Sequence, residues 1–165
     1  MIRITSSKKG NKLFDEIAIL SKIRKALLND KVAKKICKEK GVGEWFLEGV
    51  PIKFEKIKQS AKTVDSNIIL NRSLSKKPFD IMMRYVIHEL THSIQHVQAS
   101  QKKKKGKDDE DYLDKETEVE AFKYQVEFDE KERGRGKAEK YVEDLLDYHK
   151  IKGKDRADKR DELLD

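Results

Sequence analysis

Residues 79–98 are the most apolar stretch of a highly charged chain, and they contain two histidines and a glutamate. The stretch reads FDIMMRYVIHELTHSIQHVQ, whereas 42% of the 165 residues are charged and the mean hydropathy is −0.85. Apolar residues surround more than one face of the expected helix, which is typical of a buried central helix. Burying imidazole and carboxylate groups there is costly unless something pairs with them, and a metal ion would do so.

The two histidines have the spacing of metal ligands. His88 and His92 are four residues apart, so both imidazoles lie on one side of a helix, about one turn apart. A zinc ion requires this spacing for two nitrogen ligands, and Glu89 has the position of a general base beside a metal-bound water. The alternative is a surface helix with two incidental histidines, which the apolar surroundings disfavour. The sequence therefore predicts a site for one zinc ion.

A catalytic zinc site needs a third protein ligand and a position left open for water. His96 lies about 12 Å along the helix from His88, so one ion cannot bind both. His96 is expected to line the edge of the site, to donate to substrate, or simply to cap the cluster together with Gln95, and the last, non-functional interpretation is favoured. The third ligand is expected from the glutamate-rich stretch 112–128, which must pack on the central helix.

Three glutamates of that stretch are candidates for the third ligand. Glu120 stands between Val119 and Phe122 in the sequence, so we predict that it faces inward and binds the metal. Glu116, one turn back, is expected to lie behind the ligands, and Glu118 is expected to point away.

Further side chains are candidates for supporting roles. Glu127 is expected to accept a hydrogen bond from a ligating histidine, because such imidazoles commonly donate their second N–H to a carboxylate. Peptide hydrolysis also requires a donor for the developing oxyanion. The available donors, among which the sequence does not choose, are Tyr112, Tyr124, Tyr141, His96 and His149.

The remaining pattern predicts an α+β fold that is mainly helical, with a small antiparallel sheet. Helical periodicity over residues 11–40 is divided at Asn29 and Asp30, and strand patterns occur within residues 45–72. The central and glutamate-bearing helices occupy about 79–130, and another amphipathic helix covers 137–150. Residues 1–150 are expected to form one domain, followed by a charged tail, 151–165, that is either a solvated helix or disordered.

The amino-acid composition limits the binding partners and the cellular compartment that we expect for the protein. Cys37 is the only cysteine, so no internal disulfide forms, and a reducing, cytoplasmic location fits best. No run of 18 apolar residues exists, so no membrane partner is expected. The net charge of +7 permits nucleic-acid binding, but interspersed charges of both signs favour simple solvation. The block from Lys102 to Lys107 is read as an exposed loop.

Two motifs resemble those of a known family. His88-Glu-Leu-Thr-His92 followed by Glu-Val-Glu120-Ala-Phe resembles the gluzincin arrangement of small zinc metallopeptidases, and specifically the minimal phage- and prophage-associated or ImmA/IrrE-like enzymes. The resemblance covers roughly residues 64–130. It implies a zincin-like fold in which His88, His92 and Glu120 hold one Zn²⁺ and Glu89 is the base that activates water. The charged loop between the motifs is long, and no Met-Pro segment follows the glutamate helix, so the substrate stays open.

For such a metallopeptidase the expected partner is a protein or peptide substrate. The last predicted strand is placed at an exposed sheet edge, where Ile68, Ile69, Leu70 and Asn71 would hold substrate by main-chain hydrogen bonds. Two alternatives stay open. One is a non-catalytic binding or regulatory module with the same fold, which the intact Glu89 disfavours. The other is a SprT-like nucleic-acid-associated protease that binds DNA through Lys102 to Lys107.

Overall fold

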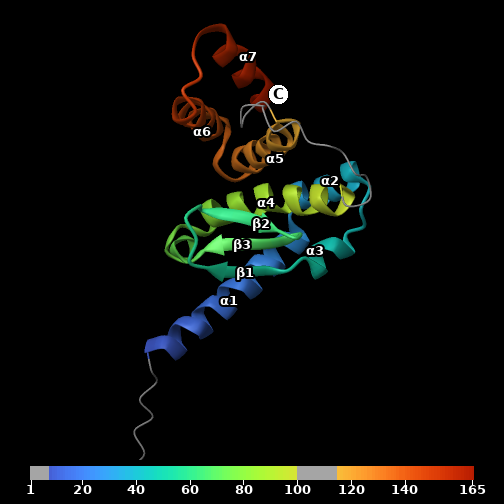
Figure 1. Ribbon diagram of the computed structural model, residues 1–165, viewed down its shortest axis with the longest axis vertical. Helices are drawn as coiled ribbons and strands as arrows, with labels where there is room; N and C mark the ends of the chain where they lie inside the picture. The colour runs from blue at the N-terminus through green and yellow to red at the C-terminus, as the bar shows by residue number, and fades with distance from the viewer. Residues whose placement is uncertain (1–7, 100–114) are drawn as a thin grey trace, which may run out of the picture.

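The central helix of the sequence is also the central helix of the fold. The computed structural model describes residues 8–99 and 115–165, and in it α4 (Phe79–Ala99) lies between a small sheet and three C-terminal helices (Figure 1). His88, Glu89 and Leu90 are all buried on α4. The architecture is mainly helical α+β, as predicted.

The first two helices of the described chain, α1 (Lys8–Asn29) and α2 (Lys31–Lys40), are divided where the sequence indicated. α1 ends beside Asp30, which caps α2 by accepting a hydrogen bond from the N–H of Ala33 at 2.9 Å. Gly41 ends α2 in the left-handed conformation, with φ of 70°, which glycine adopts without steric cost. The division at Asn29 and Asp30 is confirmed.

The sheet is mixed rather than antiparallel, which corrects the prediction. A short helix, α3 (Trp45–Gly49), precedes three strands: β1 (Ile52–Glu55), β2 (Ala61–Val64) and β3 (Asn67–Asn71). β3 lies in the middle, parallel to β1 and antiparallel to β2. The sequence pattern missed β2, because its four residues include lysine and threonine and lack an apolar run.

The segment predicted as an exposed edge is therefore the central strand. Ile68, Ile69 and Leu70 are all buried, because a strand with neighbours on both sides and α4 against one face has little contact with solvent. The placement of substrate along Ile68 to Asn71 is wrong for this reason. The edge strand beside α4 is β2.

After the sheet, the 3-10 helix η1 (Arg72–Lys76) leads into α4, and three helices complete the chain. α5 (Glu116–Arg133) packs on α4, and α6 (Arg135–Tyr148) and α7 (Gly153–Leu164) pack on α5. The tail from residue 151 is thus mostly a helix, and it is anchored because its last two leucines, Leu163 and Leu164, are buried.

Within the described part of the chain, the buried apolar residues form two separate clusters. The sheet-side core is formed by the sheet and by the helices α1, α2, α3 and α4. It includes Ile23, Leu27, Ile36, Leu47, Ile68, Leu70, Ile87, Leu90 and Ile94, with Tyr124 and Phe128 of α5. The C-terminal core is smaller and consists of Val119, Phe122, Val126, Ala138, Val142, Leu146, Leu163 and Leu164. α5 contributes to both and so joins the two parts of the molecule.

Two expectations from the sequence lie outside the described residues. They are a role for Tyr112 at the site and an exposed loop from Lys102 to Lys107. Among the residues that the structure describes, no helix is long and apolar enough to cross a membrane.

Candidate metal centre

The two histidines of α4 point at the same place. The Nε2 atoms of His88 and His92 are 3.1 Å apart, and the ring of His88 packs edge-on against Phe122 with centroids 4.5 Å apart. His88 is buried and His92 is partly buried. The helix thus presents two imidazole nitrogens toward one point beneath α5.

Glu118 of α5 supplies the carboxylate at that point. Its Oε1 lies 2.9 Å from His92 Nε2, and its Oε2 lies 3.3 Å from His88 Nε2. His88, His92 and Glu118 are the three residues that could hold a metal ion within the described part of the chain. The expectation that Glu118 points away is wrong.

Helix geometry explains why Glu120 is not at this point. Residues two apart on a helix are separated by about 200°, so Glu118 and Glu120 face nearly opposite directions. Glu120 instead binds Lys40 of α2, 2.8 Å from its Nζ, and accepts a hydrogen bond from Gln95 at 3.0 Å. The prediction assumed that Glu120 faces α4 because its neighbours in the sequence are apolar. The apolar Val119 instead faces the C-terminal core, so its position next to Glu120 does not direct Glu120 toward the histidines.

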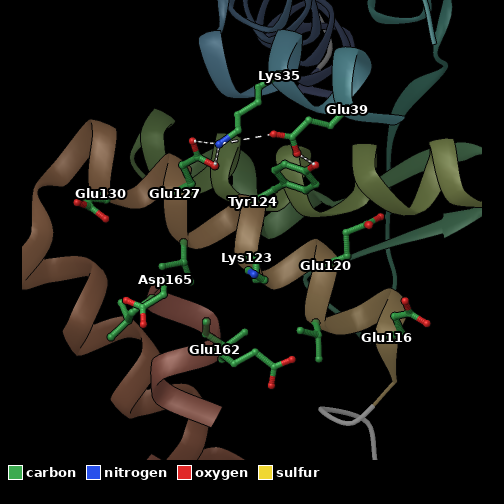
Figure 2. Close-up of a pocket in the computed structure, with 14 residues that line it drawn as sticks. Lys35, Glu39, Glu116, Glu120, Lys123, Tyr124, Glu127, Glu130, Glu162 and Asp165 are labelled. Atoms are coloured by element: carbon green, nitrogen blue, oxygen red, sulfur yellow. Dashed lines mark hydrogen bonds and ion pairs between the residues drawn. The ribbon is translucent and has the colours of Figure 1, made fainter. Parts of the chain in front are cut away.

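Figure 2 shows where the other expected acidic residues lie. Glu116, Glu120 and Glu127 line a cavity on the side of α5 that faces α2 and α7. Glu127 binds Lys35 at 2.8 Å and therefore does not brace a ligating histidine. Tyr124 donates its hydroxyl hydrogen to Glu39, so its use as an oxyanion donor at the histidine pair is not supported.

The geometry of the three side chains fits a tetrahedral zinc ion. Zinc binds imidazole nitrogen and carboxylate oxygen at 2.0 to 2.2 Å, so ligand atoms in a tetrahedral site are about 3.3 to 3.5 Å apart. The ligand-to-ligand distances of 3.1, 2.9 and 3.3 Å approach this range. In addition, the buried Oε2 of Glu118 makes no hydrogen bond to any described residue. A bound cation would pair with it.

Electrostatics keep this carboxylate ionised. Burial raises the pKa of Glu118, but the imidazoles of His88 and His92 outweigh burial and hold that pKa far below its usual value. Burial lowers the pKa of His92, but the hydrogen bond and charge of Glu118 outweigh it and raise that pKa. The cluster is therefore arranged to bind positive charge beside Glu118.

Glu89 lies next to the cluster and is held by the sheet. Thr63 of β2 lies with its Oγ1 2.6 Å from Glu89 Oε2 and 3.1 Å from the carbonyl oxygen of Glu89. The hydroxyl of Thr63 donates to Oε2 of Glu89 and holds that oxygen in place, so Oε1 is left to accept a hydrogen from another donor. The sequence did not identify Thr63, because β2 itself was missed.

A cavity of about 540 Å³ opens the cluster to solvent. It is lined by Ala61, Lys62 and Thr63 of β2, by Glu89, His92 and His96 of α4, and by Thr117 and Glu118 of α5, among others. His96 is exposed and lies at the edge of this cavity, away from the three converging atoms. A molecule entering the cavity meets the edge strand and Glu89 together.

The imidazoles of His88 and His92 each also contact a glutamine through Nδ1, the nitrogen that faces away from the cluster. His88 Nδ1 lies 2.8 Å from Gln125 Oε1, and His92 Nδ1 lies 2.8 Å from Gln95 Oε1. The sequence placed Gln95 beside the cluster together with His96, but it did not indicate that either glutamine contacts His88 or His92. The signal for Gln125 is its spacing of seven residues from Glu118, which places the two on one face of α5.

Comparison of the chain with protein-family models, with curated proteins and with solved structures gave no match.

Proposed function

We propose that this chain is a zinc-dependent metallopeptidase with a zincin-like fold, in which His88, His92 and Glu118 hold one zinc ion. The observation that carries the proposal is the convergence of two Nε2 atoms and one carboxylate within 3.3 Å of one another, beside Glu89 and at the wall of an open cavity. This keeps the resemblance to small gluzincins found in the sequence and changes its third ligand from Glu120 to Glu118.

Different residues would have different roles in peptide hydrolysis. A zinc ion at the site would supply Lewis acidity to a water molecule and to the scissile carbonyl. Glu89 accepts a proton from the water as its oxygen adds to the carbonyl carbon and the carbonyl oxygen becomes an oxyanion. Glu89 then delivers that proton to the amine nitrogen, so the peptide C–N bond breaks as the C=O bond re-forms. Thr63 keeps the carboxylate of Glu89 in place for both transfers.

The substrate is assigned to the open edge of β2. The N–H of Asn71 donates to the carbonyl of Ser60 at 2.9 Å, which makes these two residues a hydrogen-bonded pair of the antiparallel ladder. Because such pairs alternate, the backbone groups of Lys62 point to β3, and those of Ala61 and Thr63 point outward. An extended peptide paired with Ala61 and Thr63 would pass beside Glu89.

Hydrolysis of a peptide library by the zinc-loaded protein tests the proposal. We expect mass spectrometry to detect new peptide termini with wild type, and none after chelation or with Glu89→Gln. The matched control is that Glu89→Gln keeps its zinc, because Glu89 is a base and not a ligand. Cleavage by zinc-loaded Glu89→Gln at the wild-type rate would contradict the proposal, and so would zinc-loaded wild type that cleaves no member of the library.

A further inference from the structure

Gln95 has only one orientation that satisfies its contacts. Its side-chain nitrogen lies 3.0 Å from the carbonyl oxygen of Thr117 and 3.0 Å from Glu120 Oε1, and both of these atoms only accept hydrogen bonds. The amide oxygen must therefore be the atom 2.8 Å from His92 Nδ1. Because that oxygen only accepts, Nδ1 of His92 carries a hydrogen, which directs metal binding to Nε2.

Gln125 makes the same contact to the other histidine from inside the fold. It is 1% exposed, its oxygen lies 2.8 Å from His88 Nδ1, and its nitrogen donates to the hydroxyl of Tyr141 at 2.7 Å. Arg84 lies over the ring of Tyr141, 4.3 Å from the centroid, and binds the buried Asp129 at 2.9 Å. The orientation of His88 is thus set by connected side chains of which Gln125 and Asp129 are buried and Tyr141 and Arg84 are partly buried.

We propose that Gln95 and Gln125 are positioning residues that hold both ligand imidazoles with the hydrogen on Nδ1, and so preset the two Nε2 atoms to bind one metal ion. The inference rests on the proposed function only in naming zinc as the ion. Gln125 accepts the hydrogen of His88 through a neutral amide. A carboxylate in its place would add a second buried negative charge near Asp129.

The two glutamines differ in burial, and this sets the size of their effects. Gln125 is buried between α4, α5 and α6, whereas Gln95 is partly exposed at the cavity and is held through Glu120 by the 2.8 Å ion pair with Lys40. Water can replace the amide oxygen at His92 more readily than at His88. The loss of Gln125 should therefore weaken metal binding more than the loss of Gln95.

The test compares variants that keep or remove the acceptor oxygen at constant size. Gln125→Met and Gln95→Met remove it, and Gln125→Glu retains it, because the hydroxyl of Tyr141 can donate to a carboxylate. Gln98→Met is the matched control, because Gln98 is also on α4 but donates to the carbonyl oxygen of Lys40. Zinc affinity is measured by competition with a chromophoric chelator. Protonation of each Nδ1 in the zinc-free protein is measured by ¹⁵N NMR of the histidine rings.

We expect about a 10- to 100-fold weaker zinc Kd for Gln125→Met, a smaller loss for Gln95→Met, and near wild-type values for Gln125→Glu and Gln98→Met. Equal zinc affinity in wild type and both methionine variants would overturn the inference while leaving the metal site intact. Should wild type bind no zinc, the proposed function fails, and the NMR experiment decides separately. Hydrogen on Nδ1 of both rings then supports the inference, and its absence overturns it.

Discussion

The sheet-side core and the C-terminal core are built in different ways. The first is a large apolar cluster drawn from the sheet, α1, α2, α3 and α4, with two residues of α5, and it buries long aliphatic side chains such as Ile87 and Leu90 completely. The second is a small cluster among α5, α6 and α7, surrounded by exposed ion pairs such as Glu143 with Arg160 at 2.7 Å. Exposed ion pairs contribute little to stability, so the second part is expected to be the weaker one.

The candidate metal centre lies where these two parts meet. His88 and His92 belong to α4 in the sheet-side core, whereas Glu118 is carried by α5, which joins both cores. A metal ion held by all three would therefore tie the weaker part to the stronger one. Function and stability are expected to depend on the same contact.

The largest effect is expected from the buried ion pair that joins α4 to α5. Arg84 and Asp129 have side chains 12% and 2% exposed and lie 2.9 Å apart. Arg84→Leu leaves Asp129 buried and unpaired, which should lower the free energy of unfolding by about 3–5 kcal/mol in denaturant titrations. Arg84→Leu combined with Asp129→Leu should recover most of that loss. A double variant as unstable as the single one would contradict this account.

Zinc removal is expected to have the next largest effect. At a free zinc concentration of about 100 times Kd, binding stabilises the folded state by about 2.7 kcal/mol, and chelation removes this. Hydrogen exchange should then rise mainly in α5, α6 and α7, and much less in β3. Equal increases in both parts would show that the C-terminal core is not the weaker one.

The pH dependence of the zinc-free protein should show the Glu118–His92 pair. The pKa of Glu118 is below its usual 4.5, so this group stabilises the fold above that pH and the contribution is lost on acidification. The pKa of His92 is above its usual 6.5, so its contribution is present below that pH and is lost as pH rises through the folded value.

The melting temperature of the zinc-free protein should therefore be higher at about pH 6 than at about pH 8. With zinc bound, the melting temperature should instead be higher at about pH 8 than at about pH 6, because protons compete with the metal for the imidazoles at the lower pH. Glu118→Gln, which removes the charge that raises the pKa of His92, is the control and should flatten the zinc-free profile. An unchanged profile in that variant would contradict the assignment of the pair.

The smallest effect is expected at Tyr124, whose hydroxyl contacts α2 and not the histidines. Its hydroxyl donates to Glu39, so Tyr124→Phe should cost about 1 kcal/mol of stability and leave zinc affinity unchanged. Tyr141→Phe is the matched comparison, because that hydroxyl contacts Gln125 behind His88. Loss of zinc affinity in Tyr124→Phe alone would reverse the roles assigned to the two tyrosines.

Local signals in the sequence were sufficient for most of the helices. Asp30 and Gly41 delimit α2 by capping, and the apolar density of residues 79–98 identified α4 as the central helix. The sheet was harder, because strand order depends on contacts between segments and not on any one segment. β3 has the strongest strand pattern because it is central, and the short β2 has a weak pattern because it is an edge.

The candidate metal site was likewise only partly predictable, because it combines residues from two segments of the chain. His88, Glu89 and His92 belong to one helix, so their relative placement follows from a spacing of four residues. Glu118 belongs to another helix, whose rotation depends on how α5 divides its faces between α4, α2 and the C-terminal core. The motif residues alone do not determine that rotation. Spacing within α5 would have indicated it, because Glu118, Phe122 and Gln125 share one face.

The most direct test is the zinc content of protein purified without added metal, compared among wild type, Glu118→Gln and Glu120→Gln. The two variants are matched, since each replaces one carboxylate by an amide two residues apart on α5. We expect about one zinc per chain in wild type and in Glu120→Gln, and almost none in Glu118→Gln. Full zinc content in Glu118→Gln, or loss in Glu120→Gln alone, would contradict the metal centre described above.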